Sequence, residues 1–260
     1  MDTVSYADEY MELMKTVHAN NNVLNVSTIT LICNLNVDKI CMQTFCEHFD
    51  ETGVEVKRYK RNDEFEITKR GNIKKSFFNQ VTLNYCDISK KSIKVFSNGK
   101  LQITGITSCL ECNKVAEMVN GWLVKYLHDD SIRITDTYIG MLNSNFSMMT
   151  NIDLIKLNGV LNHVSHVVSV YNPESYPAIN MKYVKDGTSV SVFIFATGNI
   201  VITGGKRLKD MQTAYSFVHD IIHSHREWVC KDDLHNPKAT RVEPYVHGYS
   251  VRQCMSCTTM

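Results

Sequence analysis

The chain has 260 residues, enough for one large domain or two of ordinary size. Its formal net charge of +1 argues against a protein that binds nucleic acid or membranes through overall charge alone. The nine cysteines are an odd number, and we find no leader-like segment and no apolar run long enough to span a bilayer. We therefore expect an intracellular, reducing setting with free thiols.

The first half of the chain predicts a helical extension followed by a strand, a helix and several more strands. Residues 1–22 carry an amphipathic helical pattern, and an alternating strand over 23–35 precedes a helix over 37–49. The charged segment 51–75 is expected to be a solvated insertion, because acidic residues interrupt its lysines and arginines. Strand patterns and a helix follow, over residues 77–85, 93–105 and up to about 127.

The second half opens near residue 132 with a strand that no clear alternation marks. A helix is expected around 152–161, and a proline-bracketed turn leads into a strand over 171–184. A hairpin and a helix then reach about residue 228. We divide the chain into an extension (1–22), a first repeat (23–130), a second repeat (131–229) and a tail (230–260) that is expected to be disordered.

Two segments of the chain are copies of one another. Residues 93–105 (IKVFSNGKLQITG) align without a gap with residues 192–204 (VFIFATGNIVITG), at an offset of 99 positions. Each copy alternates apolar and polar residues, passes a glycine turn and alternates again, which predicts a β-hairpin. Helical patterns in matching register follow both hairpins. The duplication therefore predicts a pseudo-twofold molecule.

One face of each predicted hairpin is apolar throughout and the other is unusual. The apolar faces, which we expect in the core, are Ile93, Val95, Leu101 and Ile103 in the first copy and Val190, Val192, Ile194, Ile200 and Ile202 in the second. The opposite faces repeat a large aromatic residue, Phe96 and Phe195, and a threonine, Thr104 and Thr203. Because that face should meet water, the repeated aromatic marks it as the candidate functional face.

These segments resemble the repeat of the TATA-box-binding protein family. Both copies carry FxxGxxxxTG before a helix, and the second, IFATGNIVITGGK (194–206), is the closer match. YNPESYP (171–177) resembles the loop called the stirrup in the family's second repeat, and TITLICNL (28–35) resembles its first strand. The resemblance covers about residues 23–225, and the extensions and divergence resemble those of members from large DNA viruses.

The resemblance implies an α+β fold, a saddle of two pseudo-symmetric repeats, each a curved antiparallel sheet with two helices. It also implies an initiation factor that binds promoter DNA through the minor groove and bends it with paired aromatic wedges, a binding mode for which the family is the standard example. Such a factor prefers A·T-rich sequence, because the minor groove distinguishes little else.

The wedges are assigned by matching positions to the family's motif. Phe96 and Phe195 take one wedge position of each pair, and Tyr176 takes the second position in the second repeat. In the first repeat the constant offset favours Phe77, whereas the alternation of the following strand favours Phe78. We choose Phe78.

Further DNA contacts follow from the resemblance. The threonines and Val201 match groove-facing residues, while Gln102 and Lys94 stand where the second repeat is apolar, so the first repeat is the more polar. Lys100, Lys182 and Lys206 are candidates for phosphate contacts, and their small number predicts a low affinity and a shallow salt dependence. The predicted contacts are Asn25, Lys100, Gln102, Thr104, Lys182, Phe193, Val201, Thr203 and Lys206.

The resemblance also implies protein partners and a location. Pro173 and Glu174 of the stirrup match the family's contact with a B-type general initiation factor, and the RNA polymerase machinery follows from it. The insertion at 51–75 stands against the family's A-type contact. The expected location is the nucleus or, for a viral chain, the cytoplasmic virus factory and the virion.

Two cysteine pairs with CxxC spacing, Cys109/Cys112 and Cys254/Cys257, raise the question of zinc. The first pair lies at the start of a repeated helix whose other copy has Leu208 and Met211, so we predict no metal and no cofactor. The sequence has no P-loop, GxSxG, HExxH or dinucleotide-binding motif, so we predict no enzyme. The main alternative is a protein-docking scaffold of the same fold with weak or no DNA bending, and a weaker one is a substrate-gripping module of a nucleic-acid enzyme.

Overall fold

The computed structural model describes residues 24–51, 54–57, 80–86, 89–108 and 111–231. These residues form two compact units, the first holding residues 28–141 and the second residues 24–27 and 142–231. The compact units divide at residues 141/142, because two long strands, β1 (Asn25–Leu35) and β6 (Ile134–Ser147), each contribute to both units.

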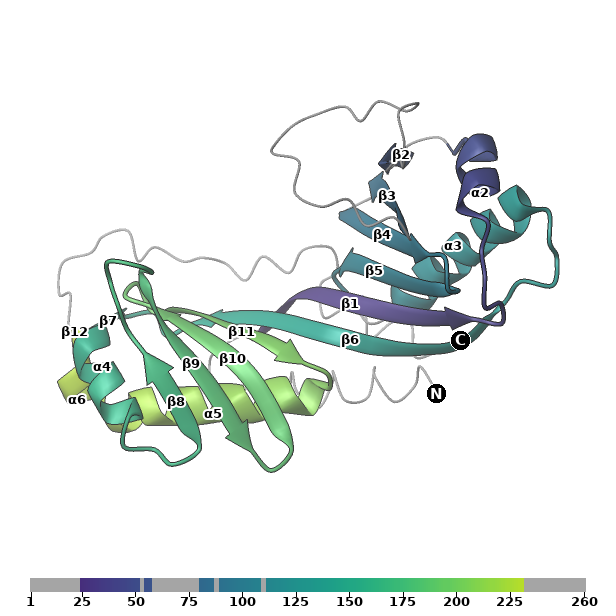
Figure 1. Cartoon of the computed structure of the whole chain (residues 1–260). Helices are drawn as coiled ribbons and strands as arrows, with labels where there is room; N and C mark the ends of the chain where they lie inside the picture. Colours follow the sequence, from purple (N-terminus) through teal and green to yellow (C-terminus); the bar gives the residue numbers. More distant parts are fainter. Residues whose placement is uncertain (1–23, 52–53, 58–79, 87–88, 109–110, 232–260) are drawn as a thin grey trace, which may run out of the picture. The chain divides into compact units, whose positions relative to one another are not determined.

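The first unit is an antiparallel sheet covered by two helices (Figure 1). Its strands lie in the order β2-β3-β4-β5-β1-β6, and the helices α2 and α3 contact each other and the strands. The elements not yet given are α2 (Met42–His48), β2 (Val54–Lys57), β3 (Gln80–Cys86), β4 (Lys90–Phe96), β5 (Lys100–Ile106) and α3 (Glu111–Leu127).

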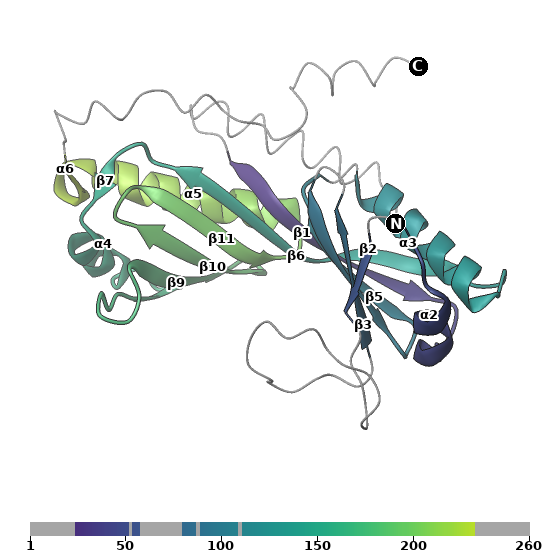
Figure 2. The ribbon, with the colours of Figure 1, turned by 90° about the horizontal axis from the view of Figure 1, so that it is seen from above.

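The second unit repeats this plan with the order β6-β11-β10-β9-β8, and α5 runs along one face of the strands (Figures 1 and 2). A separate two-stranded ladder joins β12 to β7. The elements are β7 (Asn151–Ile152), α4 (Leu154–Leu161), β8 (Val167–Val170), β9 (Ala178–Lys185), β10 (Thr188–Phe195), β11 (Asn199–Gly205), α5 (Leu208–Ser224), α6 (Arg226–Val229) and β12 (Cys230–Lys231).

The predicted hairpins are confirmed, and their turns have the same backbone conformation. Gly99 and Gly198 end the turns with φ of +76° and +80°. Gly105 and Gly204 near the ends of β5 and β11 have φ of +97° and +89°. Left-handed φ is costly for residues with a Cβ, which explains why glycine is repeated at both sites.

The core of each unit lies between the sheet and its helices. All nine apolar hairpin residues predicted to be buried have no exposed surface. The helix residues Cys112, Val115, Ala116, Val119, Trp122 and Leu123 are buried against the first sheet, and Met211, Ala214, Tyr215, Val218 and Ile222 against the second. In each unit, the sheet face turned away from the helices is called the open face.

An acidic residue anchors the first turn of the long helix in both units. The Asp210 carboxylate accepts hydrogen bonds from the backbone N–H of Lys206 (3.1 Å) and the Thr188 hydroxyl (3.2 Å). It also forms an ion pair with Arg207 at 2.6 Å. Its counterpart 99 positions earlier, Glu111, accepts the Thr107 backbone N–H at 3.2 Å. Carboxylates are favourable there, since the helix N-terminus carries partial positive charge.

Glu111 also pairs with a buried lysine, Lys91. The sequence gives no reason to expect this lysine in the core. Lys91 has no exposed surface, and its Nζ lies 2.8 Å from Glu111 Oε1. It also donates to the Ser89 carbonyl and hydroxyl oxygens at 3.3 and 3.2 Å. Val190 occupies the matching position in the second unit, where Arg207 supplies the positive charge from the helix side.

Asp210→Asn is expected to destabilise the protein by about 1–3 kcal/mol at neutral pH, because it removes charge-assisted hydrogen bonds. Burial raises the pKa of the Asp210 carboxyl, but the Arg207 and backbone hydrogen bonds outweigh it and hold the pKa below its ordinary value of 3.8. A depressed pKa means that the stabilisation is present above pH about 4 and is lost as the pH falls further. Denaturant unfolding of both proteins from pH 7 to pH 3 measures this.

The matched control is Asp220→Asn on the same helix, where the side chain is 76% exposed. It should leave the unfolding free energy nearly unchanged across the range. A difference between wild type and Asp210→Asn that stays constant down to pH 3 would contradict the assigned role of the charge.

The structure differs from the sequence-based boundaries in two further places. Strand β2 lies inside the segment read as an insertion, pairs with β3 and corresponds to β8 of the second unit, so residues 54–57 belong to the repeat. Helix α2 begins at Met42 instead of about residue 37. The predicted N-terminal helix (1–22), residues 52–53 and 58–75 of the insertion, and the tail beyond residue 231 lie outside the described residues.

Candidate functional site

Strand register aligns the open-face residues of the second unit into rows that cross the sheet. Lys182 pairs with Ser191, Ser191 with Thr203, and Thr203 with Asn143. The next row joins Asn180, Phe193, Val201 and Asn145 in the same way. A third row begins with Ala178 beside Phe195. Side chains directly opposite in an antiparallel sheet touch, so these rows form one continuous surface.

An aromatic group lies at the end of this surface next to the loop before β9. The Tyr176 ring centroid is 5.8 Å from that of Phe193 and 6.3 Å from that of Phe195. Tyr176 is 45% exposed and both phenylalanines are half-buried. Ala178, opposite Phe195, is small and buried, which leaves room for the aromatic rings. Two predicted residues, Tyr176 and Phe195, are thus brought together.

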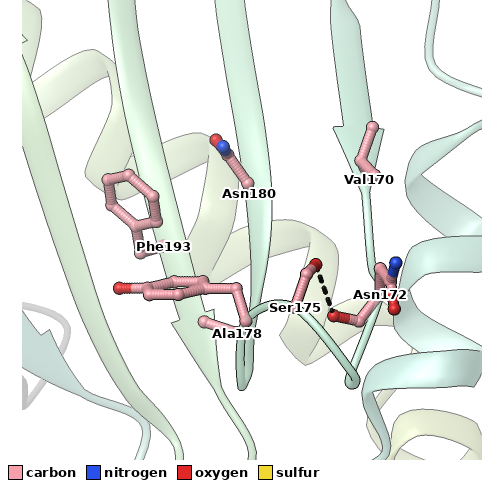
Figure 3. A pocket seen from close by; sticks show the side chains of 7 residues that line it. Val170, Asn172, Ser175, Ala178, Asn180 and Phe193 are labelled. Atoms are coloured by element: carbon pink, nitrogen blue, oxygen red, sulfur yellow. Dashed lines mark hydrogen bonds between the residues drawn. The ribbon is translucent and has the colours of Figure 1, made fainter.

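The loop that carries Tyr176 is held by an asparagine. The Asn172 carbonyl accepts the backbone N–H groups of Ser175 and Tyr176, and its side-chain oxygen accepts the Glu174 N–H at 3.1 Å. The Ser175 hydroxyl also donates to the Asn172 carbonyl (Figure 3). Side-chain bonding of this kind is how Asn stabilises turns. Pro173 and Glu174 are therefore presented to solvent on an ordered turn.

A pocket of about 240 Å³ opens between this loop and the open face of the second unit. Phe193 and Asn180 come from neighbouring strands, with Val170 and the loop residues on the other side (Figure 3). Its lining is Val170, Asn172, Ser175, Tyr176, Ala178, Asn180 and Phe193. The pocket extends the aromatic surface, and its amides and hydroxyl supply polar contacts.

Three asparagines add hydrogen-bonding groups, and sequence reasoning found only one of them. Thr203 donates its hydroxyl hydrogen to Asn143 Oδ1, and Asn25 Nδ2 donates to Asn145 Oδ1 at 3.4 Å. Asn25 was predicted, whereas Asn143 and Asn145 lie in the strand whose alternation is unclear. The pattern Asn-Ser-Asn at residues 143–145, with polar residues at every second position, was the available signal.

The middle row of the first unit is polar at its centre, where the second unit has Phe193 and Val201. Thr82 pairs with Lys94, Lys94 with Gln102, and Gln102 with Ile32. The row beside it joins Ser92, Thr104 and Thr30. Phe96 pairs with Gln80 and is half-buried. Both Phe77 and Phe78 lie outside the described residues, so the structure does not describe the partner of Phe96.

The predicted phosphate-binding lysines are all exposed. Lys100 and Lys182 lie on β5 and β9, and Lys206 lies directly before α5. Their side chains make no ion pair with another described residue. They can therefore meet an anion without first breaking a salt bridge.

The described cysteines and helices add little chemistry. Burial raises the pKa of the Cys33 thiol to about 11, which keeps it protonated and unreactive. Cys112 is buried in α3, and the other three CxxC cysteines lie outside the described residues. Among the described residues, no group of three or more His, Cys, Asp or Glu side chains is arranged to hold a metal ion. No described helix is both long and apolar enough to cross a membrane.

Comparisons with known proteins point to one family. A family model described as transcription factor TFIID (or TATA-binding protein, TBP) matches residues 142–225. A TATA-box-binding protein-like protein of Acanthamoeba polyphaga mimivirus is 31% identical over 258 residues, covering 84% of this chain and 69% of that protein. The chain belongs to the TATA-box-binding protein family. TATA-box-binding protein C of Halobacterium salinarum is 29% identical over 126 residues, covering 48% of this chain and 66% of that protein.

The solved structures agree on the fold. Methanococcus jannaschii TBP matches with a TM-score of 0.53 at 19% identity, covering 77% of this chain and 98% of that chain. The α+β fold that the resemblance to the TATA-box-binding protein family implies is therefore confirmed, as is the likeness to a viral member. The family model falls within the second unit, which is also where sequence reasoning found the closer match to the TATA-box-binding protein repeat.

Proposed function

We propose that this TATA-box-binding protein relative is a non-catalytic initiation factor that binds A·T-rich promoter DNA in the minor groove and bends it. The observation that carries the proposal is the aromatic group on the open face of the second unit, where Tyr176 and Phe195 lie beside Phe193. Aromatic rings exposed on a sheet can enter between base pairs at a kinked step and replace part of the lost stacking.

The rest of the open face of the second unit suits the floor and walls of a minor groove. Val201 and Thr203 are β-branched and half-buried, so they offer a close, flat contact to sugars. Asn143 and Asn145 carry amide donors for the acceptors that A·T pairs present there. Lys182 and Lys206 supply charge for phosphates. The few such lysines favour a shallow salt dependence.

Two arguments support a second wedge in the first unit. Phe96 matches Phe195 in sequence and in its place at the end of a strand. The β3–β4 and β9–β10 registers pair Gln80 with Phe96 and Ala178 with Phe195, so β3 corresponds to β9 at an offset of 98 positions. Counting 98 positions back from Tyr176 gives Phe78, and not Phe77, as its counterpart in the first repeat.

A FRET titration tests the proposal directly. Short duplexes labelled at both ends would carry a TATA-like core, a scrambled A·T core or a G·C core, over a salt series. The proposal expects an increase in end-to-end FRET with the A·T cores and little with the G·C core. Absence of bending at low salt on all three duplexes would overturn it.

The proposed partners are a B-type general initiation factor and, through it, the RNA polymerase machinery. The ordered turn that presents Glu174 to solvent supports the contact. We expect Glu174→Arg to weaken capture of a B-type factor on preformed DNA complexes by at least about tenfold, because charge reversal at an interface costs more than truncation. DNA bending itself should be unchanged, and the exposed Asp186→Arg on the β9–β10 turn is the matched control. Equal capture of the B-type factor by the two variants would show that Glu174 is not part of the interface.

Kinship with the mimivirus protein supports a viral setting for this function, in a cytoplasmic virus factory and the virion or in the nucleus. The second candidate function is a protein-docking scaffold with weak DNA bending. It is favoured by three exposed valines on the edge strand β8 and its neighbour β9, Val168, Val170 and Val184, which are 70%, 61% and 53% exposed. Binding of initiation factors that is independent of DNA, without bending, would favour the scaffold.

A further inference from the structure

The central rows of the two open faces differ in chemistry at matching positions. In the second unit Phe193 lies directly opposite Val201. In the first unit Lys94 lies directly opposite Gln102, 99 positions earlier on both strands. The flanking polar rows agree more closely, since Ser92 and Thr104 match Ser191 and Thr203. The middle of this row is therefore polar in the first unit and apolar in the second, whereas at its β1/β6 end the order is reversed, with Ile32 beside Gln102 and Asn145 beside Val201.

The Lys94 and Gln102 side chains are available to an outside ligand. Both are half-buried, and among the residues that the structure describes neither makes a side-chain hydrogen bond or ion pair. The amide and the ammonium lie next to each other on paired strands. By contrast, Thr203 and Asn143 in the second unit bond to each other. The first unit thus presents one acceptor and several donors at the point where the second unit is apolar.

This difference bears on how each unit meets a G·C pair. An A·T pair shows only acceptors in the minor groove, whereas a G·C pair adds the guanine N2 amino group as a donor. Pressed against Phe193 and Val201, that donor would lose its water and meet no acceptor on these two side chains, which is costly. The Gln102 amide oxygen can accept it. The Gln102 amide nitrogen and Lys94 Nζ can donate to the N3 and O2 atoms that every base pair presents.

Resting on the proposed function, we propose that Gln102, supported by Lys94, lets the first unit accept a G·C pair in its half of the site, which the second unit rejects. The two half-sites are then read unequally. A site with a G·C pair in one half is bound in a single orientation, with the first unit over that half. Gln102 is the specificity-determining residue, and Lys94 contributes donors that do not depend on sequence.

Competition binding on a symmetric set of duplexes tests the proposal without knowledge of the orientation. The cores are all A·T, A·T with one G·C pair in one half, and A·T with one G·C pair in each half. The single pair is moved in turn through each position of the half. For wild type at the most favourable position, we expect the first G·C pair to weaken binding by less than about threefold and the second by at least about tenfold, a typical mismatch penalty. The first G·C pair weakens binding little because the protein binds in the orientation that places its first unit over that pair.

Variants assign the effect to the named residue. Gln102→Val should make the first G·C pair as damaging as the second, about tenfold or more. Lys94→Val should weaken binding to all duplexes about equally and keep the difference between the two steps. The reciprocal change, Val201→Gln in the second unit, should reduce the penalty of the second pair. Thermal unfolding of each variant shows that binding differences do not come from unfolding.

The outcomes separate this proposal from the one on which it rests. Equal penalties for the first and second G·C pair in wild type, with the all-A·T duplex still bound and bent, would overturn the role of Gln102 and leave the proposed function standing. The same holds for unequal penalties that survive in Gln102→Val. An all-A·T duplex that is neither bent nor preferred over a G·C duplex would overturn the proposed function and this inference with it.

Discussion

Phe195→Ala is expected to abolish the compact, bent DNA complex while leaving the fold intact. The Phe195 side chain is half-buried on the open face and contacts Tyr176, so its removal opens no cavity between sheet and helices. Without the ring, unstacking at the kinked step is uncompensated, which costs a few kcal/mol and weakens binding by about 100-fold. End-to-end FRET and competition binding on an A·T duplex measure the loss.

Conservative and distant variants sharpen this result. Phe195→Leu should retain part of the bend, because leucine also serves as an apolar wedge. Phe96→Ala should cause a comparable loss through the other unit. Trp228→Ala is the control for removing an exposed aromatic residue, since Trp228 is 60% exposed on α6 and its ring contacts only the Lys156 ammonium, 4.4 Å from the ring centroid, among the described cation–π pairs. Normal bending by Phe195→Ala would refute the wedge mechanism.

Gly198→Ala is expected to destabilise the protein by about 3 kcal/mol or more, through strain and collision together. The residue has φ of +80°, and a Cβ built there would lie 2.2 Å from the Thr150 carbonyl oxygen. That contact is with backbone, so no side-chain rotation relieves it. Gly99 occupies the same position in the first unit, where a built Cβ would lie 1.9 Å from the Val37 carbonyl oxygen.

The chain supplies a control that separates the two causes. Gly187, on the β9–β10 turn, has φ of +78° but no neighbouring atom within 4 Å of a built Cβ. Gly187→Ala should therefore cost only about 1–2 kcal/mol, the left-handed penalty alone. Chemical denaturation of both variants measures the difference. If Gly198→Ala and Gly187→Ala lose the same stability, the close approach to Thr150 does not matter.

The hairpins and long helices could be predicted from sequence because their periodicity is regular. Alternating apolar residues around a repeated glycine specify the core face, and all nine of the predicted core positions are fully buried. Strand β6 could not be placed because Ser144 occupies a fully buried position, with its hydroxyl 3.5 Å from Met211 Sδ. A polar residue in the core removes the apolar alternation that marks a strand.

The same limitation explains what was missed in the candidate site. Asn143 and Asn145 flank Ser144, so they could be assigned to the open face only once the register of β6 against β11 was known. Lys91 reads as a surface residue, and only the three-dimensional position of Glu111 explains its burial. The duplication singled out Phe96 and Phe195, and the resemblance of its loop to the stirrup assigned Tyr176, although the Tyr176–Phe193 contact needed the structure.

The passage of β1 and β6 through both units makes the duplication inseparable. Residues 24–27 of the first repeat belong to the second unit, and residues 134–141 of the second repeat belong to the first. A chain cut between residues 130 and 131 would give two fragments that each lack a strand segment held by the other. Each fragment would depend on its counterpart to fold, and the covalent link supplies that counterpart at high effective concentration.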